Sequence, residues 1–245
     1  MEKNKLQALV GVTLMLTLAI TSMIAVSPEA KAADFDEPGY ALIAAPQFGL
    51  DSQVDEAKNL RNYLIDHGWS DERIIFLADL NESYVDGDAT KSEIENATNE
   101  IALSATSSDL VFIGIMDHGQ EINGHSYFRT GDVGDPTYIK DTEFANWVDD
   151  IQNFETMVIY ISSPYSGGFV SELEGNYRIV ISDCGENQTY TTSEYTFYEA
   201  LTEPQADSDG DGKISVEEAY TWMEDYMQVQ DPVIYDYQKD DEVFL

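Results

Sequence analysis

The chain has 245 residues, with 12 basic and 47 acidic side chains and a formal net charge of −35. Such a surface repels phosphate groups, so we expect neither nucleic acid nor an anionic membrane as a partner. The single cysteine, Cys184, excludes an internal disulfide framework, and together with only three histidines it argues against a zinc site of the Cys/His type.

The N-terminal segment resembles a secretory leader. Two early lysines precede an apolar run at residues 6–26, and Ala30-Lys31-Ala32 then offers small residues at the spacing that signal peptidase accepts. We therefore predict a signal peptide over residues 1–32 and a secreted or cell-surface protein. The alternative is an uncleaved anchor, because about 20 apolar residues can also span a bilayer. No second apolar stretch of that length follows, so we expect no stable membrane insertion after cleavage of the leader.

Short apolar runs alternate with amphipathic helical patterns along the rest of the chain. The predicted strands lie at residues 40–45, 74–77, 110–115, 157–161 and 178–182, and the predicted helices at residues 52–67, 92–103 and 141–151, with a small hairpin at residues 124–129. The strand at 110–115 is apolar on both faces, which is typical of a central parallel strand. The alternation predicts an α/β fold, a three-layer α/β/α sandwich with a mostly parallel sheet.

Ligands and chemistry in such a sheet lie beyond the carboxyl ends of the strands. Residues 116–119 follow the third predicted strand, residues 162–168 the fourth, and residues 183–187 the fifth. The fourth strand and its turn, VIYISSPYSGGF, break over a sharp bend into a helix, which is where α/β enzymes often hold a nucleophile. The tip of this turn, however, is Pro164.

The motif FIGIMDHG, followed about 40 residues later by VIYISSPYSGGF, resembles the caspase–legumain class of cysteine peptidases, especially its legumain-like branch. That class places one apolar strand before His-Gly and a second before Asp-Ala-Cys-x-Ser-Gly. The likeness extends over roughly residues 40–227 and includes ALIAAP, DGDATKSEI and ADSDGDGKISVEEAY. It implies the α/β fold of the class and a site built for peptide hydrolysis.

The resemblance assigns a role to each residue at these strand ends. His118 takes the place of the general base, and Gly119 that of the residue whose backbone N–H helps to bind the oxyanion. The nucleophile's position falls on Pro164, and that of the family's aspartate on Ser162. Proline has neither a thiol nor a backbone N–H, so this one residue removes the nucleophile and an oxyanion donor together. We interpret the turn as a former active site.

Three other residues are candidates for a relocated nucleophile. Ser163 and Ser166 flank the tip, although serines in such turns usually shape the turn itself, and Cys184 ends the adjacent strand, where a small buried hydrophobe is the simpler interpretation. The leading hypothesis is a secreted homologue without peptidase activity that binds a peptide or protein ligand. One alternative is an active endopeptidase with a relocated nucleophile. The other is an acidic surface protein that stores cations at many weak sites.

A second motif, DSDGDGKISVEE at residues 207–218, matches the twelve-residue calcium loop of EF-hands at every defining position. Alternating carboxylates, a backbone carbonyl, a water-linked hydroxyl and a bidentate glutamate would bind Ca²⁺, while Gly212 allows the sharp turn at loop position six. The predicted ligands are Asp207, Asp209, Asp211, Lys213, Ser215 and Glu218. An isolated extracellular loop of this kind is expected to be structural and weak, with a Kd of roughly 10⁻⁴–10⁻³ M. The alternative is an acidic turn that binds nothing tightly.

These motifs divide the chain after the leader into three parts. Residues 34–201 are predicted to form the caspase/legumain-like α/β domain, and residues 202–228 an EF-hand-like appendage with the loop and its exit helix. Residues 229–245 are predicted to be an acidic tail, because blocks of acidic residues usually mark solvated segments.

Overall fold

The structure is a computed structural model, and it describes residues 39–46, 51–131, 137–189, 195–237 and 242–245. The predicted leader, residues 1–32, lies outside this part of the chain. None of the helices within the described residues has the length and apolar character needed to cross a membrane.

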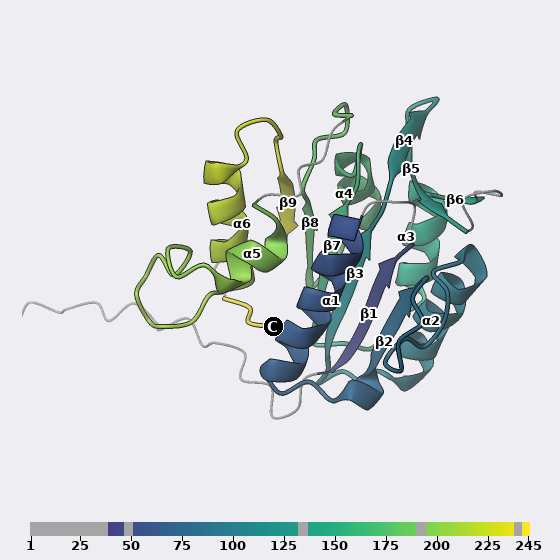
Figure 1. The fold of residues 1–245 in the computed structure, drawn as a ribbon, viewed down its shortest axis with the longest axis horizontal. Coiled ribbons are helices and arrows are strands. Elements are labelled where there is room, and N and C mark those ends of the chain that lie inside the picture. Colours follow the sequence, from purple (N-terminus) through teal and green to yellow (C-terminus); the bar gives the residue numbers. More distant parts are fainter. Residues whose placement is uncertain (1–38, 47–50, 132–136, 190–194, 238–241) are drawn as a thin grey trace, which may run out of the picture.

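A six-stranded sheet forms the centre of the molecule, with the strand order β2-β1-β3-β7-β8-β9 (Figure 1). Five of these strands run parallel, and β9 pairs antiparallel with β8. Every residue of the two middle strands, β3 and β7, is buried, as the apolar sequence of β3 indicates. The strands are β1 (Tyr40–Ala45), β2 (Ile74–Ala78), β3 (Leu110–Met116), β7 (Thr156–Ser162), β8 (Arg178–Ser182) and β9 (Val233–Asp236).

Helices cover both faces of this sheet and complete the three-layer sandwich that the sequence predicts. Successive residues of a strand face opposite sides, so Ile43 of β1 belongs to one hydrophobic cluster and Leu42 to the other. The first cluster packs under α1 (Asp51–Asp66), α5 (Phe197–Thr202) and α6 (Val216–Tyr226). The second packs under α2 (Lys91–Ser104), α3 (Asp141–Asp149) and α4 (Gly167–Leu173). A short 3-10 helix, η1 (Asp71–Arg73), precedes β2.

A second, three-stranded antiparallel sheet with the order β4-β5-β6 stands beyond the carboxyl end of β3 (Figure 1). We call it the small sheet; its strands are β4 (Gly119–Ile122), β5 (His125–Thr130) and β6 (Thr137–Lys140). The hairpin expected near residues 124–129 is therefore confirmed, and it extends further on both sides. Phe128 of β5 packs against Phe144 of α3 and Phe169 of α4, with ring centroids 5.3 and 5.4 Å apart, which fixes the small sheet beside the main one.

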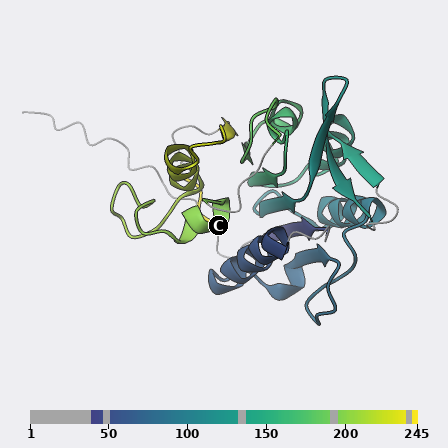
Figure 2. The ribbon, with the colours of Figure 1, turned by 45° about the horizontal axis from the view of Figure 1, so that its top comes forward.

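The chain after residue 201 is more closely integrated than a separate appendage followed by an acidic tail. Ala219, Met223 and Leu245 are buried in the same hydrophobic cluster as α1, and the C-terminal residue lies beside α1 and α5 (Figures 1 and 2). Within the expected tail, β9 joins the main sheet, and the backbone N–H of Val216 donates to the carbonyl of Val243 over 2.8 Å. The tail prediction is wrong here because the apolar and aromatic residues of β9 outweigh the acids around them.

Candidate functional site

The two strand-end motifs meet at the carboxyl edge of the main sheet. β3 and β7 are neighbours, and the backbone N–H of Asp117 donates to the carbonyl of Ser162 over 2.9 Å. Gly119 approaches the following turn so closely that a Cβ atom there would lie 1.9 Å from the carbonyl oxygen of Pro164. His118-Gly119 and Pro164, predicted as members of one site, are thus placed side by side, and only glycine has room at position 119.

The turn between β7 and α4, residues 163–166, is held in an unusual conformation. Tyr165 has a φ of 64°, in the left-handed region that bulky residues rarely adopt. Its N–H donates to the carbonyl of Gln188 over 2.8 Å, and its carbonyl accepts from the hydroxyl of Ser126 over 2.7 Å. These bonds fix the strained turn from two sides, although the residue at its tip has no reactive group.

A buried acid, Asp183, lies beneath this turn. It follows β8, its side chain is fully buried, and it accepts from the hydroxyls of Ser162 over 2.7 Å and Ser166 over 3.1 Å. Burial raises the pKa of Asp183 to about 7, although the hydrogen bonds from these serines act in the opposite direction. The aspartate that the resemblance places at position 162 is therefore absent, but a carboxyl group from the adjacent strand contacts the serine that replaces it.

A second buried acid, Glu56 of α1, adjoins Asp183. The hydroxyl of Tyr160, which is fully buried in β7, donates to Oε1 of Glu56 over 2.9 Å. Burial, and after it the charge of Asp183, raise the pKa of Glu56 to about 8. Both carboxyl groups are enclosed by the protein, so their contacts hold the turn and the sheet rather than a substrate. Sequence reasoning missed this pair. An acidic residue on a helix or after a strand has the same local sequence pattern whether its side chain is buried or exposed.

The three candidates for a relocated nucleophile are all buried. Ser163, Ser166 and Cys184 each have a relative exposure of 0%. The thiol of Cys184 donates to the carbonyl of Gln188 over 3.3 Å, and the hydroxyl of Ser166 is engaged by Asp183. A nucleophile has to touch the carbonyl carbon that it attacks, so none of the three is placed to do so.

A small cavity of about 250 Å³ opens beside His118; it is lined by His118, Gly119, Gln120, Arg129 and Tyr138. The carboxyl group of Asp117 lies fully buried directly before His118, and its Oδ1 accepts from the N–H of His118 over 2.6 Å. Burial raises the pKa of Asp117 well above its ordinary value, although the nearby charge of Arg129 lowers it in part. The cavity therefore lies between the end of β3 and the small sheet.

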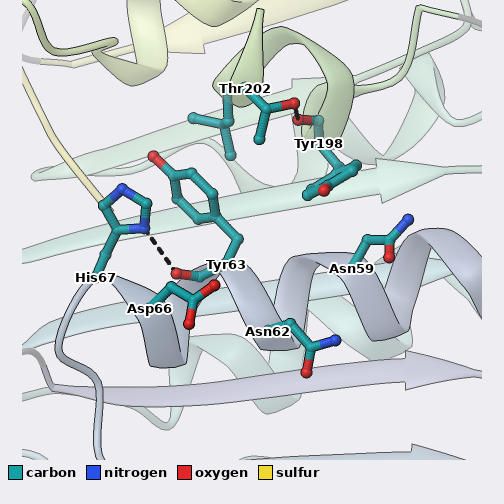
Figure 3. A pocket seen from close by; sticks show the side chains of 8 residues that line it. Asn59, Asn62, Tyr63, Asp66, His67, Tyr198 and Thr202 are labelled. Atoms are coloured by element: carbon teal, nitrogen blue, oxygen red, sulfur yellow. Dashed lines mark hydrogen bonds between the residues drawn. The ribbon is translucent and has the colours of Figure 1, made fainter.

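A larger cavity of about 400 Å³ lies between α1 and α5 (Figure 3). The side chain of Tyr63 extends from α1 toward α5, and the ring of His67 stacks on it with centroids 3.9 Å apart. The opposite end of α1 is the one near His118 and Pro164, because Gln53 donates to the carbonyl of Asp117 over 2.8 Å. This cavity is thus separate from the β7–α4 turn; it is lined by Asn59, Asn62, Tyr63, Asp66, His67, Tyr198, Leu201 and Thr202.

The acidic loop, residues 207–218, brings three of the predicted ligands together. Carboxylate oxygens of Asp207, Asp209 and Asp211 lie within 4.8 Å of one another and form a group that could hold a metal ion. Gly212 has a φ of 89°, which glycine adopts without strain at the sharp turn. This donor set of closely spaced oxygens suits a hard cation such as Ca²⁺.

The remaining predicted ligands, Lys213, Ser215 and Glu218, make contacts within the protein that shape the loop and the start of α6. Glu218 accepts from the backbone N–H groups of Ser208 and Asp209 over 2.7 and 3.2 Å, so it ties the end of the loop to its beginning. Burial alone would raise the pKa of Glu218, but its hydrogen bonds outweigh that effect and lower it. Ser215 is buried and forms a capping box with Glu218 at the start of α6, while the side chain of Lys213 is exposed and lies over the ring of Phe244.

An additional acid, Glu242, lies close to the loop, although sequence reasoning assigned it to the tail. Burial, followed by the charges of Asp209, Glu218 and Asp211, raises its pKa. Only the folding back of the C-terminus brings it there, so no local pattern could have identified it. The loop therefore concentrates negative charge from two distant parts of the chain.

Comparison with known proteins finds one family match: the family model of the Peptidase C13 family matches residues 79–231. This span is more than half of the chain and contains His118, Gly119, Pro164 and the acidic loop. A search of curated proteins finds no match.

Proposed function

The chain belongs to the peptidase C13 family, and we propose that it is a legumain-like member without peptidase activity that acts by binding a peptide or protein. Pro164 carries this proposal, because it stands at the tip of the turn that faces Gly119. Ser162 also departs from the family's motif, but Pro164 is the decisive change, because proline offers no atom that could attack a carbonyl group.

The expected loss of rate is large. Removing the nucleophile of a serine protease lowers kcat by about 10⁶. Removing one oxyanion donor costs a further factor of about 10²–10³, and proline lacks the backbone N–H that a cysteine at position 164 would supply. Pro164 offers no proton that a general base could remove, so the presence of His118 does not restore the reaction.

The alternative of a relocated nucleophile has little support. Cys184 and Ser166 would have to leave their buried positions and hydrogen bonds before either could reach a substrate. Gly119 has a reason to persist without catalysis, because no side chain has room beside Pro164. The site therefore keeps its shape while lacking the group that reacts.

Calcium binding at the acidic loop and export from the cell complete the proposal. The cluster of Asp207, Asp209 and Asp211 supports the first, and Ala30-Lys31-Ala32 after an apolar run supports the second. The loop packs through α6 into the main core, so a bound ion would stabilise the whole fold. If the leader is cleaved, N-terminal sequencing of the released protein will begin near Ala33.

Covalent labelling tests the loss of the nucleophile directly. A peptide with a thiol- and hydroxyl-reactive warhead should leave the native protein unlabelled, as followed by intact mass. Pro164→Cys, combined with Ser162→Asp and Ser163→Ala to restore the family motif, should introduce labelling at position 164. Labelling of the native protein that disappears in His118→Ala would show an active nucleophile and contradict the proposal.

A further inference from the structure

The small sheet differs in charge from the rest of the molecule. Its three strands carry two cationic side chains, Arg129 and Lys140, and one acid, Glu121. In the whole chain, acidic residues outnumber basic ones by 47 to 12. With Asp117 before β4 and Asp141 after β6, the small sheet is close to neutral rather than strongly acidic, so an anionic group meets less repulsion there than elsewhere on the molecule.

The register of the small sheet puts Arg129 and the pocket residues on one face. Along β5 the buried residues alternate with half-exposed ones, and Arg129 belongs to the outward set together with Tyr127. Residues paired directly across antiparallel strands share a face. Tyr138 of β6 is paired with Arg129, and Gln120 of β4 with Tyr127, so all of them face outward.

These outward residues meet His118 in the cavity of about 250 Å³ beside the former site. Three of the residues that line it, Arg129, Gln120 and Tyr138, have side chains that can donate hydrogen bonds. A guanidinium presents its N–H groups as a planar fork that matches the two oxygens of a carboxylate. The volume is below the roughly 300–1,000 Å³ of a pocket for a whole small molecule, so it suits one functional group.

We propose that this pocket binds a carboxylate group of a peptide ligand, with Arg129 as its anchor and Gln120 and Tyr138 as further donors. The inference deepens the proposed function, because it rests on the binding of a peptide at the former active site. The carboxylate could come from an acidic side chain or from a C-terminus. Since Gly119 touches Pro164, a ligand held there would lie against a turn that does not cleave it.

Small probes separate these two sources and avoid any dependence on peptide sequence. N-acetylglycine carries a terminal carboxylate, the α-amide of N-acetylglutamate carries a side-chain carboxylate, and N-acetylglycinamide carries none. Binding to the full mature chain, in calcium and at constant ionic strength, is followed by NMR shifts of the backbone amides of Gly119 and Gln120. We expect at least one carboxylate probe to bind about tenfold more tightly than the neutral amide; the probe that does so identifies the source.

Arg129→Gln should abolish this preference, and Tyr138→Phe should weaken it. Lys140→Gln is the matched control: it removes the same charge from the outward face of the same sheet, but Lys140 does not line the pocket. Lys140→Gln should change the affinity for the carboxylate probe by less than about threefold. Melting curves verify that each variant is folded.

Three results would overturn the inference. They are equal binding of the three probes, no binding of either carboxylate probe, and an equal loss of affinity for the carboxylate probe in Arg129→Gln and Lys140→Gln. None of these results bears on Pro164, so they leave the proposed loss of activity intact. Conversely, peptide hydrolysis by the same preparation would contradict the proposed function without affecting the carboxylate measurement.

Discussion

Gly119 is the first residue of β4, and its backbone lies against the carbonyl group of Pro164. In an active member of the family, this glycine would be explained by its oxyanion-binding N–H. Here the packing alone requires it, because the nearest atom to a Cβ would be a backbone oxygen that cannot move away cheaply. Packing is therefore a sufficient reason for a glycine at this position, whether or not the residue takes part in a reaction.

Gly119→Ala should lower the free energy of unfolding by about 1–3 kcal/mol or more, since an overpacked site has to shift its backbone. Gly87→Ala is the control, because a Cβ there would meet its nearest atom, of the Leu77 side chain, at an ordinary 3.6 Å. Urea denaturation of both variants measures the difference. Equal stability of the two variants would show that the turn shifts at little cost to accommodate a Cβ atom. Packing would then not explain why position 119 is a glycine.

The raised pKa values of the buried acids Glu56 and Asp183 predict that stability decreases as the pH rises, opposite to the effect of most carboxyl groups in folded proteins. Their folded-state pKa values of about 8 and about 7 lie above the ordinary values of 4.5 and 3.8. Between these limits the folded state holds protons that the unfolded state has released, so stability is present at low pH and is lost as the pH rises. We expect the free energy of unfolding to fall from about pH 5 to about pH 8.

Glu56→Gln should flatten this slope, because glutamine can still accept the hydrogen bond from Tyr160 and does not titrate. Urea denaturation at several pH values provides the measurement. Glu95→Gln, on an exposed part of α2, is the control and should leave the slope unchanged. A slope equally steep in Glu56→Gln would place the pH dependence elsewhere in the molecule.

At the scale of elements, the strands with long apolar runs were predictable, and so was their common carboxyl edge. That edge brought His118 and Pro164 together, because parallel strands end on one side of a sheet. β9 and α5 were not predicted: β9 lies among acidic residues, and α5 has only 6 residues. Both are stabilised by partners distant in the sequence, as is Asp183 under the β7–α4 turn, and local patterns do not reveal such partners.

The acidic loop should couple calcium to the stability of α6 and the core. A ligand that binds only the folded state adds about 1–3 kcal/mol at concentrations 10- to 100-fold above its Kd, which for this loop means roughly 1–100 mM Ca²⁺. We expect an upward shift of the Tm that is abolished by Asp207→Asn with Asp211→Asn. Glu218 is left unchanged because it also caps α6.

The matched control is Glu95→Gln with Glu100→Gln, which removes two exposed acids of α2 far from the loop in sequence. Its calcium-induced shift should equal that of the native protein. If instead both double variants lose the shift equally, diffuse acidic charge rather than the loop would account for the effect.

At the scale of the whole molecule, the C-terminal residues complete the fold. β9 extends the main sheet, while Val243 and Leu245 are buried against the layer of α1 and α6. Removal of residues 230–245 should therefore lower the Tm strongly or prevent folding, whereas a solvated tail could be removed without effect. Thermal melting of the truncated chain measures this, and an unchanged Tm would contradict the role given to the C-terminus.

The central claim is that the molecule has kept a peptidase fold and lost the peptidase reaction at Pro164. The most direct measurement is incubation of the purified mature protein with a mixed peptide library, with and without calcium, followed by mass spectrometry of the products. We expect no cleavage above the level of a blank in either condition. Reproducible turnover that disappears in His118→Ala would show that the site is active and that another residue serves as the nucleophile.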